Sequence, residues 1–431
     1  MRSRHCYWLW LSLALLLAGC AVNPVTGRNE LALMNVSVAQ EVEMGGKSFD
    51  QALQRMGGLY PDPVLNDYVN QVGQRLARTS HRPELHYRFR VVNDSSPNAF
   101  ALPGGYIAVT RGLLINMENE AQLAAVLGHE IGHVTARHSV QELQRSMLLG
   151  TTVGLIGTLA GGTGYEQLLT QVGSLTADLL GKSYSRDQEY EADRLGIEYL
   201  ARSDYAVQGA VQLQTLFMQK LDTSSNNDWL SGLFRTHPFS RDRLEANRQL
   251  IARNYVEFRS QDGLDRDRYS RHTFSLRETR EAYRLYDQAR SAEAAGNLAG
   301  AIETYHKAMQ LAPEHGLLLT GLGMAYLRNE DMVPARRYLL KAISVDPDFY
   351  QSRMGLGYIY LQNKQAGDAA AHLEASIKLL PTVEGTFLLA EAEEARANPV
   401  RARQLYQLVV EADANGRLGQ AAATRLKGLA Q

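Results

Sequence analysis

The chain of 431 residues has little cysteine and no excess of charge of either sign. Its only cysteines, Cys6 and Cys20, both lie among the first twenty residues, so the rest of the chain can form neither a disulfide nor a cysteine-ligated metal site. The 45 Lys and Arg residues nearly balance the 46 Asp and Glu residues, which leaves a formal net charge of −1. With no basic run or patch in the sequence, we expect no nucleic-acid partner.

The N-terminus has the features of a targeting segment. Arg2 and Arg4 precede an apolar run over residues 7–17, which is short for a membrane span. Leu-Ala-Gly-Cys at 17–20 resembles the lipobox of bacterial lipoproteins, in which the cysteine becomes the lipidated N-terminus. This resemblance predicts that residues 1–19 are a signal peptide and that Cys20 carries a lipid, with residues 20–37 as a tether. The alternative is a plain secretory signal with a chance cysteine.

The resemblance also predicts where the protein is located. Ala21 directly follows the cysteine, and in bacterial lipoproteins such a residue favours the outer membrane over retention at the inner one. We therefore expect a periplasmic protein that contacts the membrane through the lipid at Cys20.

The motif His-Glu-Ile-Gly-His at 129–133 lies in a helical pattern that we expect to run from Glu120 to about Met147. His129 and His133, four residues apart, share one helix face and can bind the same metal ion. Glu130 projects about 100° round the helix from His129, where it can act as general base on metal-bound water. The motif is short, and a helix with two surface histidines is its alternative.

A second pair of residues strengthens the metal hypothesis. Glu189 and Asp193 are also four residues apart on a helical pattern. Glu189 can complete a His-His-Glu zinc site, and Asp193 can accept the free ring N–H of a ligating histidine. Three protein ligands leave a fourth position for water, whose pKa zinc lowers to about 7, which is typical of a catalytic zinc site. We therefore predict one zinc ion per chain.

Two further histidines are candidate members of this site. His237 precedes a proline at a helix start, so it can be a simple turn residue. It can also swing to the zinc as a further ligand that blocks water, or stabilise the oxyanion. His138 lies nine positions after His129 and is expected on the opposite helix face. Glu191 is expected to be solvated, because it points away from the face of Glu189.

A strand-like stretch precedes the histidine motif and is interrupted by a proline. Proline within a strand pattern indicates an edge strand or a bulge, and an edge strand can bind an extended peptide by strand addition. An ordinary β-hairpin is the alternative. The residues predicted to form this substrate-binding edge are Asn98, Ala99, Phe100, Ala101, Leu102, Pro103 and Gly104.

Residues 147–181 are rich in Gly and Leu and nearly uncharged. Their glycines argue against a continuous membrane span, and we expect helices that cover the active-site cleft and can touch the bilayer surface. Residues 223–228 are rich in Ser and Asn and predict a surface loop.

The C-terminal third contains an internal repeat. Pro313, Pro347 and Pro381 are 34 residues apart, and Gly-Leu-Gly motifs at 321–323 and 355–357 keep the same spacing. This period predicts tetratricopeptide repeats, here four units and a capping helix. Such arrays expose a concave groove that binds segments of other proteins.

Together the motifs resemble a known protease family. The 129–133 motif, Glu189 with Asp193, the 98–105 stretch and His237-Pro238 occur in the order seen in gluzincins of the HtpX and CAAX-prenyl-protease type. With the repeats, the chain is similar to the β-barrel assembly-enhancing proteases. The resemblance implies a periplasmic zinc endopeptidase that degrades misfolded or stalled outer-membrane β-barrel proteins, binds their assembly machinery through the repeats, and uses the histidine at position 237 as a gate. The lipobox, and the absence of cysteine from the repeats, depart from that family.

The predicted fold class is mainly α with a small β-sheet: a zincin-like metalloprotease domain followed by an all-α tetratricopeptide-repeat solenoid. The metalloprotease domain is expected over residues 38–258, a linker over 259–276 and the repeats over 277–431. The predicted function is that of a lipid-anchored periplasmic zinc endopeptidase in envelope protein quality control. The alternative is a chaperone or adaptor for outer-membrane assembly whose zinc site is closed or mainly structural.

Overall fold

The computed structural model describes residues 20–23, 25–31, 36–148, 180–181, 183–223, 231–258 and 263–429. The predicted signal peptide, most of the 147–181 cover and nearly all of the 223–228 loop lie outside the described residues. Within the described ranges, no helix combines the length and apolar character needed to cross a membrane.

The N-terminal two-thirds of the chain combine two small sheets with helices, and the last third is helical throughout. The strands are β1 (Cys20–Val22), β2 (Asn29–Leu31), β3 (Arg88–Val92), β4 (Ala99–Leu102) and β5 (Tyr106–Thr110). The helices of the first part are α2 (Val38–Arg55), α3 (Pro63–Ala77), α4 (Arg111–Leu114), α5 (Glu120–Thr135), α6 (His138–Leu148), α9 (Arg186–Arg202), α10 (Gln208–Thr223), α11 (Ser231–Thr236), α12 (Arg241–Asn254), η3 (Val256–Phe258), α13 (Arg266–His272) and α14 (Phe274–Glu278). The predicted fold class, mainly helical with a small sheet, is confirmed.

Two helices at the centre of the N-terminal two-thirds of the chain, α5 and α9, pack closely together. Asn119 starts α5 by accepting a hydrogen bond from the backbone N–H of Gln122, and Ser185 starts α9 in a capping box with Gln188. A Cβ at Gly132 would lie 2.9 Å from the carbonyl oxygen of Ala192, so only glycine permits this approach. The two helices therefore bring their polar residues within ligand distance of one another.

The expected single helix from Glu120 to about Met147 is wrong. The chain turns at Arg137, which has a left-handed φ of 57°, and α6 starts in a new direction at His138. The turn is held by the Arg137 guanidinium, which lies 2.7 Å from Glu41 Oε1 and donates to the carbonyl of Val36. Side chains after residue 137 therefore no longer follow the face pattern of α5.

The larger sheet has the order β3-β5-β4. β3 pairs in parallel with β5, and β4 pairs antiparallel with β5, with Ala101 opposite Ile107. β4 thus forms a hairpin with β5 and also lies at the edge of the sheet. Of the predicted edge residues, Asn98 precedes the strand, and Pro103 and Gly104 form the turn after it, so the strand itself is shorter than expected.

The predicted tether and linker are more ordered than expected. β1 and β2 form an antiparallel hairpin that starts at Cys20, and the Asn23 side chain donates to the carbonyl oxygen of Ala136 at the end of α5. The predicted linker over 259–276 contains α13 and α14. Tyr269 of α13 is buried, and Arg268 lies 3.0 Å from the buried Glu120. Both segments pack on the rest of the N-terminal two-thirds of the chain. Their polar composition did not predict these contacts.

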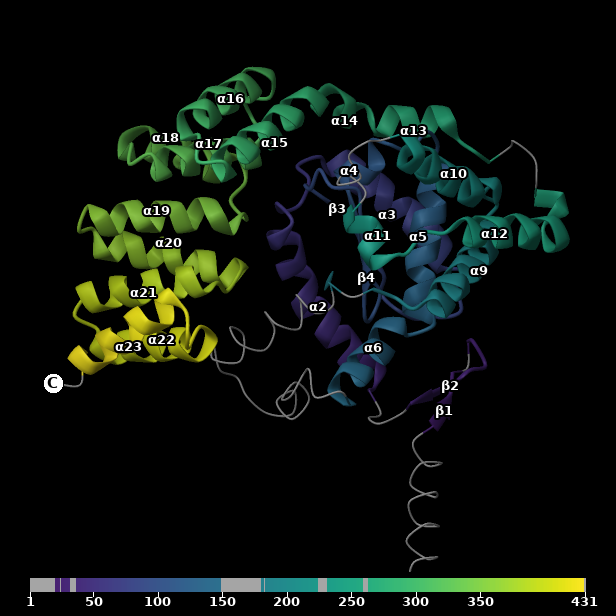
Figure 1. Cartoon of the computed structure of the whole chain (residues 1–431), viewed down its shortest axis with the longest axis horizontal. Helices are drawn as coiled ribbons and strands as arrows, with labels where there is room; N and C mark the ends of the chain where they lie inside the picture. The colour runs from purple at the N-terminus through teal and green to yellow at the C-terminus, as the bar shows by residue number, and fades with distance from the viewer. Residues whose placement is uncertain are drawn as a thin grey trace, which may run out of the picture.

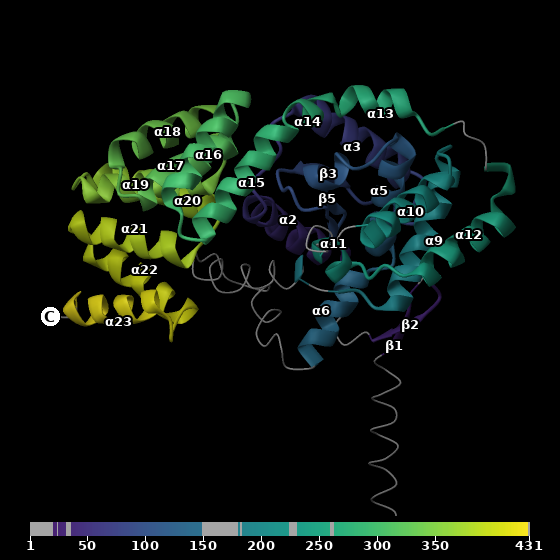
Figure 2. The ribbon, with the colours of Figure 1, turned by 45° about the horizontal axis from the view of Figure 1, so that its top comes forward.

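The C-terminal third forms four antiparallel helix pairs and a last helix (Figure 1). The pairs are α15 (Arg280–Ala294) with α16 (Leu298–Leu311), α17 (Gly316–Arg328) with α18 (Met332–Val345), α19 (Tyr350–Gln362) with α20 (Ala366–Leu379), and α21 (Val383–Ala395) with α22 (Pro399–Ala412), followed by α23 (Arg417–Leu429). The small residues of the repeat fit large partners: a Cβ at Gly323 would lie 2.8 Å from Cγ of the fully buried Leu339. The pairs stack into an arc beside the catalytic domain (Figure 2).

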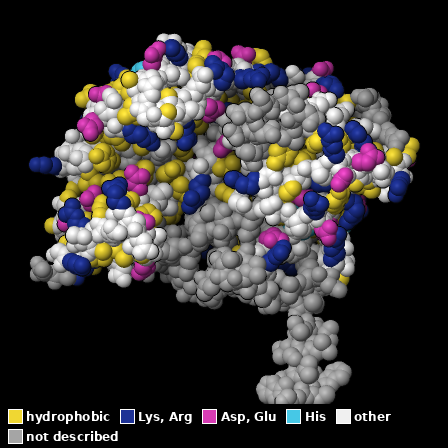
Figure 3. All heavy atoms as spheres, in the orientation of Figure 1, with side chains coloured by type: hydrophobic (Ala, Val, Ile, Leu, Met, Phe, Trp, Pro, Cys, Tyr) yellow, Lys and Arg dark blue, Asp and Glu magenta, His cyan; other side chains and the backbone are white. Residues whose placement is uncertain are grey.

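The array contacts the catalytic domain directly. Arg111 stacks over the ring of Tyr283 at 3.6 Å, and the hydroxyl of Tyr60 lies 3.1 Å from that of Thr279. Further along, the Gln54 side chain accepts from the backbone N–H of residue 350 at 2.9 Å. On the outside, basic and acidic side chains are interspersed across the face seen in Figure 3, as the near-zero net charge leads one to expect.

Candidate metal centre and active site

Four side chains from three segments meet at the junction of α5 and α9. The ligand atoms of His129, His133, Glu189 and His237 all lie within 4.8 Å of one another. His129 Nε2 is 3.0 Å from His133 Nε2 and 3.3 Å from His237 Nδ1. Glu189 Oε1 is 3.0 Å from His237 Nδ1 and 3.4 Å from His133 Nε2. Four ligands around a tetrahedral zinc are about 3.3 Å apart, so the set has the spacing of a zinc cage.

Local structure explains why these residues meet. The spacing of four residues places His129 and His133 on adjacent turns of α5, and Glu189 faces them from the first turn of α9. His237 directly follows α11, and its backbone N–H donates to the carbonyl of Leu233 at 2.8 Å. The structure therefore brings together all four residues that the sequence proposes as ligands, including His237.

Burial and charge prepare the set for a cation. Burial alone would raise the pKa of Glu189, but the charge of His237 and hydrogen bonds from His133 and His237 hold it well below its usual value. Burial lowers the pKa of His133, which keeps its ring neutral. A deprotonated carboxylate and a neutral imidazole are the forms that bind metal, so the donors fit zinc.

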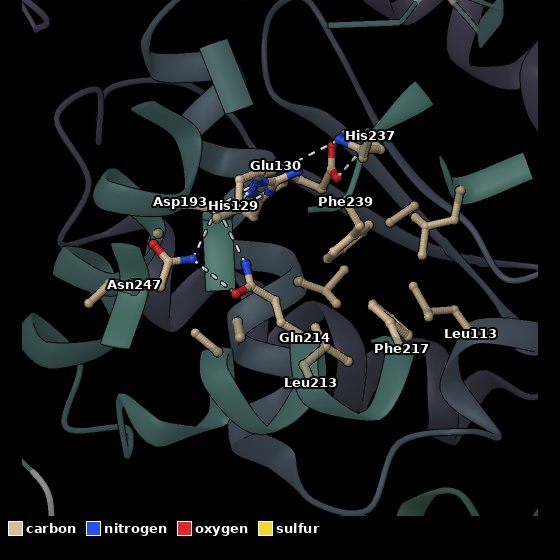
Figure 4. Close-up of a pocket in the computed structure, with 18 residues that line it drawn as sticks. Leu113, His129, Glu130, Asp193, Leu213, Gln214, Phe217, His237, Phe239 and Asn247 are labelled. Carbon is tan, nitrogen blue, oxygen red and sulfur yellow. Dashed lines mark hydrogen bonds and ion pairs between the residues drawn. The ribbon is translucent and has the colours of Figure 1, made fainter. Parts of the chain in front are cut away.

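Asp193 lies behind His129 and carries a network of its own. Its Oδ1 is 2.9 Å from His129 Nδ1, the contact that fixes which ring nitrogen faces the cage. Arg243 holds both oxygens of Asp193 at 2.8 and 2.9 Å and lies 2.5 Å from Glu189 Oε2. Asn247 and Gln214 also donate to Asp193, as the dashed lines in Figure 4 show.

His138 and Glu191 correct two expectations from the sequence. His138 was expected on the opposite helix face, but its Nδ1 lies 2.9 Å from Nδ1 of His133. Glu191 was expected to be solvated, but it is 8% exposed and its Oε2 lies 3.1 Å from His138 Nε2. The left-handed turn at Arg137 explains the difference, because it brings His138, at the start of α6, back to His133 of α5 and Glu191 of α9.

Glu130 is buried beside the cage and remains available for proton transfer. Its Oε1 is 3.5 Å from His237 Nε2, while its Oε2 has no hydrogen-bond partner among the described residues. Burial raises the pKa of Glu130, and the nearby His237 and His129 only partly offset this. A carboxyl whose pKa is raised towards neutrality suits a general base that later returns its proton.

His237 is fixed among acidic neighbours. Burial would lower the pKa of its ring, but the charges of Glu189 and Glu130 raise it to about 9. Its ring also packs at 5.4 Å from Tyr184, which stacks on His133 at 3.8 Å between ring centres. His237 therefore forms the fourth corner of the cage, beside Glu189 and Tyr184.

An apolar cavity adjoins the reacting side chains. Ala99 of β4, His129 and Glu130 lie along its wall, so the edge strand and the cage face the same space. The apolar side of this cavity is formed by Leu113, Ala125, Val126, Ile197, Ala210, Leu213, Phe217, Leu233 and Phe239 (Figure 4). The cavity, of about 50 Å³, has room for a small apolar group next to Glu130.

Sequence reasoning missed several residues of this site. Arg243, Gln214 and Asn247 are buried polar residues on α10 and α12, and Tyr184 lies in the segment before α9. The one available signal was position: Arg243 follows His237 by six residues at the start of a helix. Which carboxylates a buried arginine reaches depends on the packing of α12 on α9, and no local pattern encodes it.

Comparison with protein families identifies both parts of the chain. Residues 63–251 match the model of peptidase family M48. Residues 292–354 and 334–384 match two models of the tetratricopeptide repeat.

Curated relatives point the same way. Over 218 residues the chain is 33% identical to the β-barrel assembly-enhancing protease of Escherichia coli (strain K12), an alignment that covers 48% of this chain and 43% of the relative. It is 30% identical to the mitochondrial metalloendopeptidase OMA1 of Arabidopsis thaliana, over 47% of this chain and 40% of that protein. The chain thus spans less than half the length of these relatives.

Among solved structures, MamA from residue 41 to its end, from Desulfovibrio magneticus RS-1, covers 34% of this chain and 92% of its own. The sequence identity is 16% and the TM-score 0.30.

The histidine motif and the glutamate of α9 lie within the matched range 63–251, and helices α16 to α20 lie within the repeat matches. The resemblance predicted from the sequence is confirmed. The chain thus resembles peptidase family M48 over residues 63–251 and tetratricopeptide repeats over residues 292–384, the combination that the sequence motifs predict.

Proposed function

We propose that this chain is a zinc-dependent endopeptidase of the bacterial periplasm, held to the outer membrane by lipid at Cys20. It degrades misfolded or stalled outer-membrane β-barrel proteins and aids the assembly of others. The observation that carries the proposal is the cage of His129, His133 and Glu189 with the unpaired carboxylate oxygen of Glu130 beside it. A purely structural zinc site has no use for such a base.

The residues divide the chemistry of peptide hydrolysis among themselves. His129, His133 and Glu189 would hold one zinc ion, which supplies a Lewis acid that activates water and polarises the scissile carbonyl. Glu130 takes the proton of the attacking water and passes it to the leaving amine. Asp193 keeps the ring of His129 in the tautomer that frees Nε2.

An extended polypeptide is the substrate that this site fits. β4 lies at the edge of the described sheet, where the hydroxyl of Ser139 donates to the carbonyl of Ala101. A substrate strand would take the place of this contact and pair with β4 beside the cavity that Ala99 lines. The relative in Escherichia coli is named for β-barrel assembly, which supports unfolded outer-membrane proteins as substrates. The groove of the repeats would bind the machinery that assembles them.

A second function is favoured by the position of His237. Its Nδ1 lies 3.0 Å from Glu189 and 3.3 Å from His129, so with zinc bound a neutral His237 ring would fill the fourth position, which a catalytic site leaves to water. Such a closed site suits a chaperone or adaptor in outer-membrane assembly. In the enzyme we propose, His237 is a gate that swings away when substrate arrives.

A cleavage assay tests the proposed function. The zinc-loaded full chain and its Glu130→Gln variant are incubated with an unfolded outer-membrane β-barrel protein, and fragments are followed by gel and mass spectrometry. We expect cleavage by the first and a loss of about 10²–10⁴-fold in the second, because a general base contributes that much. Equal cleavage by both proteins would contradict the role of Glu130.

The two functions are separated by opening the gate. If His237 blocks the site, His237→Ala raises cleavage or self-cleavage, and the double variant with Glu130→Gln abolishes it. If the chain acts as an adaptor, Glu130→Gln preserves its function in cells, whereas deletion of residues 277–431 removes it. The opposite pattern in cells would exclude the adaptor.

A further inference from the structure

The two histidine ligands on α5 are supported in different ways. His129 donates directly to a carboxylate, since its Nδ1 lies 2.9 Å from Asp193. His133 has no carboxylate at its Nδ1 but a second imidazole, that of His138, at 2.9 Å. The other nitrogen of His138 lies 3.1 Å from Oε2 of Glu191. The hydrogen bonds from His133 therefore also end at a carboxylate, but the imidazole of His138 lies between the two.

The direction of the hydrogen bonds follows from the cage. Nε2 of His133 faces the other ligands and must keep its lone pair, so the ring hydrogen sits on Nδ1. Nδ1 of His133 then donates to Nδ1 of His138, which must accept. His138 consequently carries its own hydrogen on Nε2 and donates it to Glu191. This single assignment of tautomers gives every ring nitrogen of His133 and His138 a role as donor, acceptor or metal ligand.

Burial makes this arrangement specific. His138 is fully buried and Glu191 is 8% exposed, so water does not compete freely for their hydrogen bonds. Buried polar groups that lack a partner are strongly destabilising, which penalises the wrong tautomer of either ring. Tyr184 stacks against the ring of His133 at 3.8 Å between centres. The ring of His133 is therefore fixed by a hydrogen bond at Nδ1 and by stacking against Tyr184.

We propose that His138 and Glu191 form a positioning relay for the metal ligand His133, fixing the tautomer and orientation of its imidazole. The inference rests on the proposed metal site and adds to it two residues that do not touch the metal. Neither residue is catalytic, because neither reaches the substrate or the reacting atoms.

The relay also reaches the N-terminal hairpin. Arg28, between β1 and β2, places its Nε 3.4 Å from Oε1 of Glu191. The same hairpin is tied to the end of α5 by the hydrogen bond from Asn23 to the carbonyl of Ala136. Because Arg28 is half exposed, its ion pair with Glu191 is screened by salt and contributes weakly. The buried hydrogen bonds from His133 through His138 to Glu191 are therefore strong, and the ion pair between Glu191 and Arg28 is weak.

Zinc affinity of the full chain tests the relay. The dissociation constant is measured by competition with a chromogenic zinc chelator, and no substrate is needed. We expect His138→Phe, which keeps the ring shape but not the acceptor, to weaken zinc binding about 10–100-fold. His138→Asn keeps a polar atom at the position of Nδ1 and should recover most of the affinity. Glu191→Gln should fall between wild type and His138→Phe.

A matched control separates positioning from general damage. His315 in the repeat array is another histidine with a ring hydrogen bond: it is partly buried, and its Nδ1 lies 3.1 Å from the hydroxyl of Tyr283. His315→Phe should leave the zinc dissociation constant unchanged. In the cobalt-loaded proteins, the visible absorption bands should shift in His138→Phe and return in His138→Asn, because these bands report ligand geometry.

The outcomes distinguish the relay from the site itself. If wild type binds zinc and His138→Phe binds it equally tightly with the same cobalt spectrum, the relay is wrong and the metal site stands. If wild type binds no zinc, both the site and the relay are wrong. Should His138→Phe fail to fold, the relay is decided by His138→Asn and Glu191→Gln: wild-type affinity in Glu191→Gln together with a 10-fold or larger loss in His138→Asn would overturn it.

Discussion

The interior of the catalytic domain differs sharply from that of the repeat array. The catalytic domain buries charged side chains in several clusters: Glu189 and Asp193 with Arg243, Glu41 with Arg82, and Glu120 with the partly exposed Arg268. In the described part of the array, Glu393 is the one acidic or basic side chain that is buried, and the interior consists mainly of aliphatic, aromatic and small residues.

The difference indicates where buried residues serve a reaction and where they serve stability. Apolar burial contributes about 25 cal/mol per Å², so the array gains stability from each leucine that it buries. Buried charges cost solvation energy, and even well-paired ones are often no better than apolar replacements. The buried charges of Glu189, Asp193 and Arg243 are therefore explained by the cage and not by folding.

The largest effect on stability is expected at Arg243. Arg243→Ala leaves Glu189 and Asp193 buried without their shared cation, which should lower the free energy of unfolding by about 3–5 kcal/mol. Denaturant unfolding measures the loss. Arg248, which is half exposed and 4.0 Å from Glu245 on the same helix, is the control, and Arg248→Ala should change stability by less than about 1 kcal/mol. Equal losses in both variants would remove the distinction between the buried cluster and the surface.

The array should respond to a change of packing. Leu339→Ala empties the space against Gly323 and Gly355 and should cost about 2–5 kcal/mol, because a fully buried leucine leaves a cavity. The zinc dissociation constant should remain that of wild type. A large loss of zinc affinity in Leu339→Ala would show that the two interiors are not independent, contrary to our comparison.

A smaller change of opposite sign is expected at Glu130. Burial raises the pKa of Glu130 in the folded state. The ionised carboxylate therefore destabilises the fold once the pH exceeds the pKa that Glu130 has in the unfolded chain. Glu130→Gln removes this cost, and with a chelator present the variant should be at least as stable as wild type at pH 7. Its advantage should shrink as the pH falls towards 4. Clear destabilisation at pH 7 would show that the carboxylate has a structural role.

The smallest effect is expected for a surface pair of the array. Arg328 lies 2.8 Å from Glu293, but its side chain is half exposed. Arg328→Ala should therefore lower the free energy of unfolding by less than about 1 kcal/mol, and less still in high salt. A loss as large as that of Arg243→Ala would mean that ion pairs stabilise both regions alike.

The sequence predicts those features that depend on local spacing. His129 and His133 share a helix face whatever surrounds them, and the 34-residue period requires stacked helix pairs. The edge position of β4 followed from Pro103, although that proline lies in the turn and not in the strand. The meeting of Glu189 with α5 was inferred from the chemistry that a two-histidine site still needs.

The features that the sequence concealed depend on tertiary packing. A single left-handed residue, Arg137, ends α5 and turns His138 back towards His133, and nothing in the local sequence marks it. Arg243 reaches two carboxylates only because α12 packs on α9. The hairpin after Cys20 has the composition of a linker, and its order comes from contacts with Ala136 and Glu191.

Anomalous diffraction at the zinc edge, from crystals of the zinc-loaded full chain, tests the central claim most directly. We expect one strong peak per chain, about 2.0–2.2 Å from Nε2 of His129, Nε2 of His133 and a carboxylate oxygen of Glu189. The peak should be absent in crystals of Glu189→Ala. A peak elsewhere in the molecule, or an undiminished peak in Glu189→Ala, would contradict the site and the function built on it.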